Sequence, residues 1–290
     1  MKTILLLTDL SDSAAHAARS AVMLCSKLHA NLILYNNLFS IPVATFYGAG
    51  PWVPDSSSKL EKERNYKLQK LADDIEPLVQ HLKPGQFKPS VSFGCSIGSL
   101  GENVKELLLQ NDIELIVMGA SSERTLDHIL NGSDTSSVID NTNRPIIIIP
   151  PTSNFDKIDK ITFATDFNDS DVAAINYLVR LGSTFKFQLD VVHVDPLDKK
   201  GYIHDQKEED FKYAVDRLNY AGLTYNAIKG KDVVKRLLRL CDESASGMLT
   251  VVYYHHSFFV RMLHQSTAKK VLSYQKVPLM IIPSTMNFNK

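Results

Sequence analysis

The sequence predicts an α/β protein built from two tandem domains, each an open, doubly wound, parallel five-stranded sheet with helices on both faces. Short apolar segments alternate with longer helical patterns along the whole chain. Apolar segments without a polar position, such as Ile146–Ile149, indicate strands covered on both faces. The order of segments in residues 1–150 recurs in residues 151–290. We therefore expect domains at 1–150 and 151–290, related by an internal pseudo-two-fold axis.

The first half supplies five expected strands and the helices that separate them. The strands are expected at Ile4–Leu7, Leu32–Tyr35, Val91–Phe93, Leu115–Met118 and Pro145–Ile149. The helices are expected at Asp12–Leu28, Leu60–Leu82 and Leu100–Leu109, and after Gly132-Ser133. Strands separated by helices pair in parallel through right-handed crossovers, which gives this half its predicted open sheet.

The second half repeats this order. Its strands are expected at Lys160–Ala164, Asp190–Val194, Thr224–Ile228, Met248–Tyr253 and Pro278–Ile282, and its helices at Asp210–Tyr220 and Val233–Leu240. Thr8–Ser13 matches Thr165–Ser170, and Pro145–Pro150 matches Pro278–Pro283, so a duplication is predicted. The first half has an extra segment, Phe39–Lys59, and loops of that length are usually functional or mobile. The linker between the halves is expected at Thr152–Lys157.

Composition narrows the class of protein. The 290 residues include 32 Lys and Arg and 32 Asp and Glu, so the basic excess typical of nucleic-acid-binding proteins is missing. The three cysteines, Cys25, Cys95 and Cys241, form no C-x-x-C pair and are expected to be buried, reduced thiols. No signal peptide and no apolar segment of about 20 residues is apparent. The sequence thus predicts a soluble, cytoplasmic protein without a nucleic-acid or membrane partner.

Ligands of open parallel sheets bind at the carboxyl ends of the strands, where the strand order reverses. Three segments should meet there. Thr8-Asp9-Leu10 offers a carboxylate for ribose hydroxyls or an amino group, although Asp9, Ser11 or Asp12 could instead cap the next helix. Met118-Gly119 lets a backbone approach a ligand closely. Gly132-Ser133-Asp134 opens a helix and suits an anion, although Ser133 is also an ordinary helix cap.

The loop after the fourth strand resembles the nucleotide loop of the universal stress protein family. That loop has glycine, two residues, glycine, nine residues, and Gly-Ser or Gly-Thr; here the pattern is Gly119, two residues, Ser122, nine residues, Gly132-Ser133. Thr8–Ser11 is similar to the family's first-strand exit. The resemblance implies a stress-response regulatory protein that binds ATP or another adenine nucleotide. The implied binding residues are Thr8, Asp9, Leu10, Asn37, Met118, Gly119, Ser122, Gly132, Ser133 and Asp134.

Two departures from the pattern concern the phosphates. Ser122 replaces a glycine, and the Asp134 carboxylate competes with phosphate at the helix start unless a cation such as Mg²⁺ lies between them. In the second half, Val252, His255 and Gln265 replace the three glycines, so no nucleotide is expected there. His255, Phe258, Phe259 and Arg261 are expected to crowd that space, and His255-His256 is not expected to bind a metal.

The resemblance also bears on assembly and catalysis. Single-domain members dimerise through their fifth strands, which implies that Ile146–Ile149 and Leu279–Ile282 pair within this chain as an internal pseudo-dimer; a further homodimer stays open. The motifs of related enzymes are missing, so ATP hydrolysis is expected to be at most incidental. The alternative function is a nucleotide-independent module for an unknown protein partner, with Phe39–Lys59 as its surface.

Overall fold

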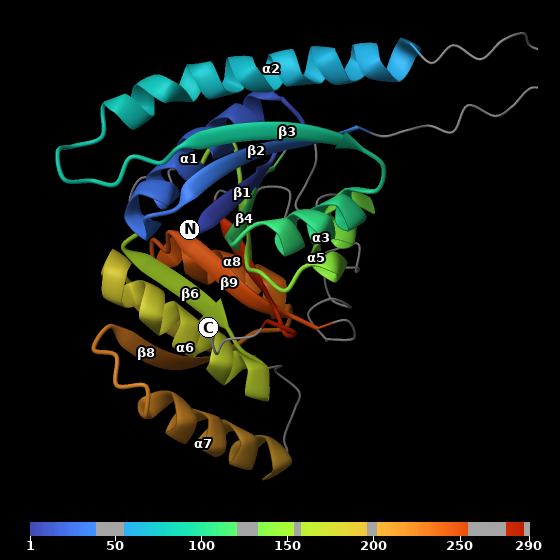
Figure 1. Cartoon of the computed structure of the whole chain (residues 1–290). Helices are drawn as coiled ribbons and strands as arrows, with labels where there is room; N and C mark the ends of the chain where they lie inside the picture. The colour runs from blue at the N-terminus through green and yellow to red at the C-terminus, as the bar shows by residue number, and fades with distance from the viewer. Residues whose placement is uncertain (39–54, 121–132, 154–157, 196–201, 255–276, 287–290) are drawn as a thin grey trace, which may run out of the picture. The chain divides into compact units, whose positions relative to one another are not determined.

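The chain folds into parallel β-strands joined by α-helices, which confirms the predicted fold class. A computed structural model describes residues 1–38, 55–120, 133–153, 158–195, 202–254 and 277–286 (Figure 1). Packing groups the chain into two compact units, Met1–Gly119 and Ala120–Lys290. The predicted boundary at residue 150 divides the sequence repeats rather than the packing units, and it stays a prediction.

The first unit contains a parallel sheet with the strand order β3-β2-β1-β4. Its elements are β1 (Thr3–Leu7), α1 (Asp12–Leu28), β2 (Asn31–Leu38), α2 (Asp55–Gln80), β3 (Val91–Ile97), α3 (Leu100–Gln110) and β4 (Ile113–Gly119). All five side chains of β1 are buried, so both faces of the sheet are covered there. α2 packs along β3 and β2 (Figure 1).

The second unit contains a sheet with the strand order β5-β10-β9-β6-β7-β8. Its elements are α5 (Ser133–Asn141), β5 (Ile146–Ile149), β6 (Lys160–Ala164), α6 (Asp169–Phe185), β7 (Gln188–Asp195), α7 (Tyr202–Asp216), β8 (Leu223–Lys229), α8 (Val233–Glu243), β9 (Met248–Tyr253) and β10 (Leu279–Pro283). The order β8-β7-β6-β9 repeats the order β3-β2-β1-β4 of the first unit.

The fifth strands of the two halves pair, as predicted. β10 runs antiparallel to β5, with Met280 opposite Ile147, while the other strands of this sheet are parallel. The side chains of β5 and β10 are all buried. This pairing explains why β5 belongs to the second compact unit, although its sequence belongs to the first repeat.

Two predicted helices differ from the structure at their ends. α2 begins at Asp55 rather than Leu60, so the last residues of the predicted insertion are helical, and the rest of the insertion lies outside the described residues. α7 begins at Tyr202, before the predicted start at Asp210, and ends at Asp216, before the predicted end at Tyr220. Asn219, just beyond this helix, turns the chain with a φ of 47°. α6 fills an interval for which no helix was predicted. In the predicted linker, residues 154–157 also lie outside the described ranges.

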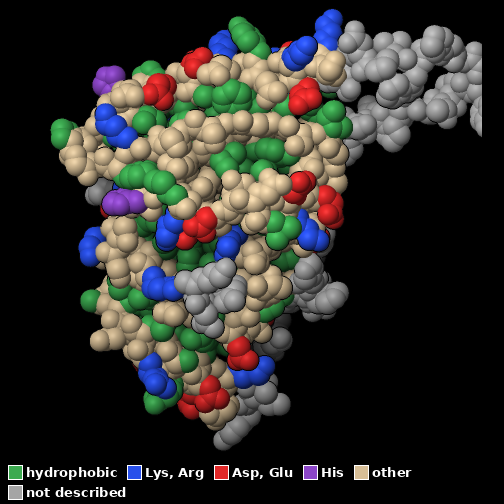
Figure 2. Space-filling model, viewed as in Figure 1, with side chains coloured by type: hydrophobic (Ala, Val, Ile, Leu, Met, Phe, Trp, Pro, Cys, Tyr) green, Lys and Arg blue, Asp and Glu red, His purple; other side chains and the backbone are tan. Residues whose placement is uncertain are grey.

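The surface and the cysteines complete this description. Figure 2 shows acidic and basic side chains mixed over the face in view, with neither sign gathered into one patch.

All three cysteines are free; Cys25 and Cys241 are buried, whereas Cys95 is half-buried. Burial raises the pKa of the Cys241 thiol to about 11, so this cysteine is an unreactive packing residue. In the described part of the chain, no helix has the length and apolar composition needed to cross a membrane.

Candidate functional site

The carboxyl edge of the first unit brings six of the predicted site residues together. β1 lies between β2 and β4, with Leu7 opposite both Tyr35 and Met118. The strand order therefore reverses at β1 and β4, which is where ligands of such sheets bind. The predicted residues at this edge are Thr8, Asp9, Leu10, Asn37, Met118 and Gly119.

The loop after β1 has a fixed and costly conformation. Leu10 adopts the left-handed region with a φ of 66°, which costs a non-glycine residue about 1–2 kcal/mol. Its backbone N–H donates to the Thr8 hydroxyl oxygen over 3.0 Å. The Thr8 backbone N–H in turn donates to the Tyr35 carbonyl over 2.9 Å. These bonds hold the loop against β2, so its polar groups are held in place before any ligand binds.

Asp9 keeps part of its carboxylate available at this edge. Its Oδ1 accepts hydrogen bonds from the Ser11 backbone N–H at 3.0 Å and from the Ser11 hydroxyl at 2.6 Å. Asp9 is exposed, and its Oδ2 accepts no hydrogen bond among the residues that the structure describes. The cap of α1 is Ser11, whose side chain accepts from the Ala14 N–H. Asp9 is therefore not the helix cap, and Oδ2 can accept hydrogen bonds from a ligand.

Gly119 is required by packing within the protein. A Cβ atom at this position would lie 2.9 Å from the Ser13 carbonyl oxygen and 3.2 Å from the Ala14 Cα. Both neighbours are backbone atoms of the first turn of α1, so they cannot rotate away. The sequence attributed this glycine to ligand approach, whereas the described contact is with α1. The glycine brings β4 and the start of α1 close together at the candidate site.

Asn37 already has two protein partners. Its Nδ2 donates to the Gly98 carbonyl over 2.9 Å, and its Oδ1 accepts from Asn103 Nδ2 over 2.7 Å. The neighbouring Asn36 is buried and donates through Nδ2 to the Thr8 carbonyl over 2.7 Å. Sequence reasoning missed Asn36, Gly98 and Asn103. Asparagine is rare in strands, so the pair at the end of β2 was the available signal.

The predicted phosphate-binding residues belong to another part of the chain. Ser133 and Asp134 are the first two residues of α5 in the second compact unit. The backbone N–H groups at a helix start lack partners within the helix and favour anions. Ser122 and Gly132 lie outside the described residues, as do His255, Phe258, Phe259, Arg261 and Gln265 of the second half.

The second half repeats the geometry of the first loop. The Thr165 N–H donates to the Val192 carbonyl over 2.9 Å, and the Phe167 N–H donates to the Thr165 hydroxyl oxygen over 3.0 Å. Phe167 is left-handed, with a φ of 59°, as Leu10 is in the first half. His193 takes the place of Asn36, with its Nδ1 2.9 Å from the Thr165 carbonyl. Strand order and loop geometry are thus shared by the two halves.

A buried carboxylate distinguishes the second half from the first. Asp171 replaces Ala14 of the first half, and only 2% of it is exposed. Its Oδ2 accepts from the Thr165 hydroxyl at 2.8 Å and from the backbone N–H groups of Asp166 and Asn168 at 3.1 and 3.2 Å. Its Oδ1 accepts from the Tyr254 hydroxyl at 3.3 Å. Burial raises the pKa of Asp171, although these hydrogen bonds act in the opposite direction.

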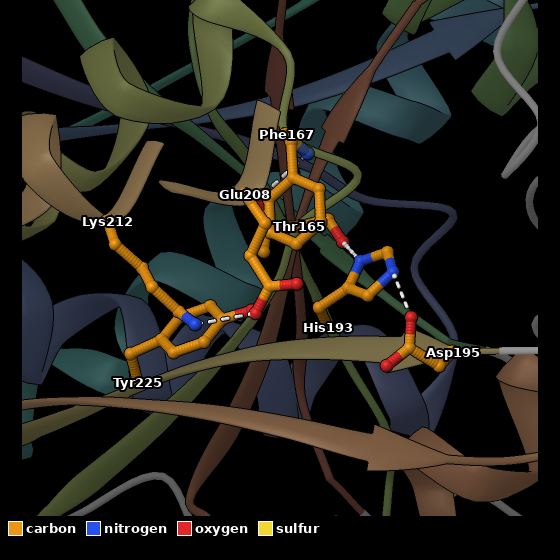
Figure 3. A network of polar contacts seen from close by, with 7 residues as sticks. All are labelled: Thr165, Phe167, His193, Asp195, Glu208, Lys212 and Tyr225. Atoms are coloured by element: carbon orange, nitrogen blue, oxygen red, sulfur yellow. Dashed lines mark hydrogen bonds and ion pairs between the residues drawn. The ribbon is translucent and has the colours of Figure 1, made fainter. Parts of the chain in front are cut away.

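Near the end of β7, one face of the second-half sheet is polar and the other is apolar. In the second half, a network of side chains surrounds the end of β7 on one face of the sheet (Figure 3). Its members are Thr165, Phe167, His193, Asp195, Glu208, Lys212 and Tyr225. Phe167 stacks on His193 with ring centroids 4.2 Å apart, and Glu208 accepts from Tyr225 over 2.9 Å.

The opposite face of β7 is apolar, with Val192 and Val194 packed against Leu237 of α8. In the first half, the corresponding face of β2 has Tyr35, which bonds to Ser96, and Asn37, which bonds to Asn103. The polar groups beside the strand ends on this face are therefore a property of the first half.

Comparison with known proteins gives a family and a fold. The sequence model described as "Universal stress protein family" matches residues 1–150. A universal stress protein from Archaeoglobus fulgidus DSM 4304 is similar in structure, with a TM-score of 0.68, 16% identity, and coverage of 97% of this chain and 96% of its own. A functionally unknown protein from Pseudomonas aeruginosa PAO1 has a TM-score of 0.58 and 15% identity, covering 97% of this chain and 92% of its own.

Other comparisons contribute less. A universal stress protein solved in complex with cAMP is 16% identical and covers 44% of this chain and 98% of its own, with a TM-score of 0.35, which is too low to bear on the ligand here. No curated protein matches this chain in sequence. At these identities the solved structures establish the fold, and the ligand has to be argued from the site.

Proposed function

Because this chain belongs to the universal stress protein family, we propose that it is a regulatory protein that binds one adenine nucleotide, ATP or a relative of it, in its first half. The observation that carries this proposal is the polar carboxyl edge of the first unit, where the strand order reverses at β1 and β4. There, a held loop presents the Asp9 carboxylate at the end of β1, next to β4, which ends at Gly119. Dedicated catalysis is not part of the proposal, and ATP hydrolysis would be incidental.

The residues of the first unit fit the sugar and base of a nucleotide. The Asp9 carboxylate can accept a hydrogen bond from a ribose hydroxyl through Oδ2, as an acidic residue does in dinucleotide-binding sheets. Thr8, Leu10, Asn37, Met118 and Gly119 would border the base and the sugar. The sequence pattern adds Ser122, Gly132, Ser133 and Asp134 for the phosphates, with Mg²⁺ between Asp134 and the phosphate oxygens.

The same reasoning assigns no nucleotide to the second half, which we propose is a duplicated copy that lost the site. The backbone N–H groups of Asp166 and Asn168 are occupied by the protein's own carboxylate, Asp171. The face that is polar in the first half is filled by an apolar cluster around Val194. Among the described residues, these two backbone donors and this apolar face therefore offer an adenine nucleotide no counterpart of the first-half site.

The duplication supplies a matched pair of variants for testing this proposal. Asp9→Ala removes the proposed ribose acceptor, and Asp166→Ala removes the exposed aspartate at the same place in the second half. A hydrogen bond to a charged group contributes about 1.5–3 kcal/mol, so Asp9→Ala should weaken ATP binding roughly 10- to 100-fold. Asp166→Ala should leave the affinity unchanged. Isothermal titration calorimetry with ATP and AMP measures both.

Two outcomes of this titration would remove the proposal. One is the absence of binding at millimolar ATP or AMP by folded protein. The other is an equal loss of affinity in Asp9→Ala and Asp166→Ala, because the site would then not be confined to the first half.

A nucleotide-independent interaction module is the second candidate. The observations that favour it are that Gly119 is already explained by packing and that Asn37 already has protein partners. Its partner surface would be the Phe39–Lys59 insertion. Removal of residues 40–53 should then abolish partner capture in affinity purification, whereas unchanged capture would argue against this candidate.

A further inference from the structure

The side-chain amide of Asn37 is held in one orientation by chemistry rather than by packing alone. The Gly98 carbonyl can only accept a hydrogen bond, so the Asn37 nitrogen must face it. The Asn37 oxygen then faces Asn103, which donates to it through Nδ2 over 2.7 Å. Gly98 is fixed in turn, because its N–H donates to the Leu38 carbonyl over 3.1 Å. The Gly98 carbonyl thus determines which end of the Asn37 amide points in which direction, and the hydrogen bond from Asn103 stabilises that orientation.

This fixed amide still has hydrogen-bonding capacity for a ligand. An amide nitrogen has two N–H groups and an amide oxygen has two lone pairs, and each Asn37 atom uses one of these on the protein. The side chain is half-buried, two residues beyond Tyr35, whose carbonyl is bonded to the loop containing Asp9. Asn37 can therefore present one donor and one acceptor, in fixed positions, at the proposed site.

The two purine bases require opposite arrangements of these groups. Adenine has an amino donor beside a ring-nitrogen acceptor, whereas guanine has a carbonyl acceptor beside a ring N–H donor. An amide that turns freely can serve either edge, but an amide fixed at both ends complements only one. We propose that the Gly98 carbonyl and the positioning residue Asn103 together set the base selectivity of the first-half site by fixing the Asn37 amide, an inference that rests on the proposed nucleotide binding.

The second half lacks this arrangement. Val194 occupies the position of Asn37, in the apolar cluster with Leu237. The residue at the place of Asn103 in α8, four residues after the cap, is Arg236, which contacts Glu243 instead. The fixed amide therefore occurs only in the half for which a nucleotide is proposed, among the residues that the structure describes.

The decisive variant is Asn103→Asp, which keeps the shape of the side chain but removes its donor. A hydrogen bond to an ionised acceptor is roughly twice as strong as a neutral one, so Asn37 should turn its nitrogen from Gly98 to the new carboxylate. The groups presented to the base are then reversed. Asn103→Leu is the control, because it removes the Asn103 donor while the Gly98 carbonyl still holds the Asn37 nitrogen. Asn37→Asp, which presents acceptors only, gives a second test of the same orientation argument.

Calorimetric titration of ATP and GTP into all four proteins measures selectivity, with melting temperatures as the check on folding. The wild type should prefer ATP by about tenfold or more, the effect of one well-placed hydrogen bond. That ratio should fall at least about tenfold in Asn103→Asp and shift towards GTP in Asn37→Asp. Asn103→Leu should weaken the binding of both nucleotides and keep the preference for ATP, because the Gly98 carbonyl still orients the amide.

A purely structural role for Asn103 predicts something different, namely that Asn103→Asp loses ATP and GTP binding equally, as Asn103→Leu does. That result would overturn the inference, as would a wild-type protein that binds ATP and GTP equally well, and either result would leave the proposed nucleotide site standing. A wild-type protein that binds neither nucleotide would overturn both the inference and the proposed function.

Discussion

Replacing Gly119 by valine is expected to lower the free energy of unfolding by about 3 kcal/mol and to abolish nucleotide binding. The new Cβ would lie 2.9 Å from the Ser13 carbonyl oxygen, and overpacking of this kind costs roughly 1–3 kcal/mol or more. Relief requires the first turn of α1 to move, and the loop containing Asp9 leads directly into that turn. Urea titration and ATP calorimetry on the same samples measure the two effects.

Gly94 provides the matched control for this substitution. It also lies in a strand of the first unit, but a Cβ placed there meets no atom within 4 Å. Valine favours strands, so Gly94→Val should leave stability unchanged or raise it slightly and should leave ATP binding intact. A Gly119→Val protein as stable as Gly94→Val would show that α1 does not pack against β4 as described.

Replacing Asp171 by alanine is expected to destabilise the protein by about 3 kcal/mol. The substitution leaves the buried Thr165 hydroxyl and two part-buried backbone N–H groups without their acceptor, and a buried unsatisfied donor costs about 1–3 kcal/mol. Ala14 occupies the same place in the first half, so the backbone tolerates alanine and the loss should come from the hydrogen bonds. Asp169→Ala, at an exposed position in the first turn of α6, should cost less than about 1 kcal/mol.

The effect of Asp171 on stability should depend on pH. Burial raises the pKa of Asp171 in the folded protein above its value of about 4 in the unfolded chain. The folded protein therefore binds this proton more tightly than the unfolded chain does. The resulting stabilisation is fully present below about pH 4 and is lost as the pH rises through the folded pKa. Denaturant titrations across this range should show a larger loss in Asp171→Ala at the acidic end, and a constant difference would contradict this assignment.

Much of the fold could be predicted because strands buried on both faces consist almost entirely of apolar residues. Ile146–Ile149 and Leu279–Ile282 consist of apolar residues throughout, and the structure pairs them. Helix ends were less predictable because they depend on single backbone conformations, such as the left-handed Asn219 that follows α7. Such a turn leaves little trace in the pattern of apolar residues.

The site was predictable only in part, because its polar contacts join residues far apart in sequence. Asn103 bonds to Asn37 across 66 positions, and Tyr254 bonds to Asp171 across 83. Local motifs pointed to Asp9 and Gly119, but they gave no indication that α1 rather than a ligand requires the glycine. Ser122 and Gly132 lie outside the described residues, so their predicted role in binding phosphates stays a prediction.

The number of nucleotides bound by each chain tests the central claim most directly. Native mass spectrometry of the protein equilibrated with millimolar ATP reports this number without any assumption about affinity or mechanism. One bound nucleotide per chain is predicted, retained in Asp166→Ala and reduced in occupancy in Asp9→Ala. Two nucleotides per chain, or none, would contradict the assignment of a single site to the first half.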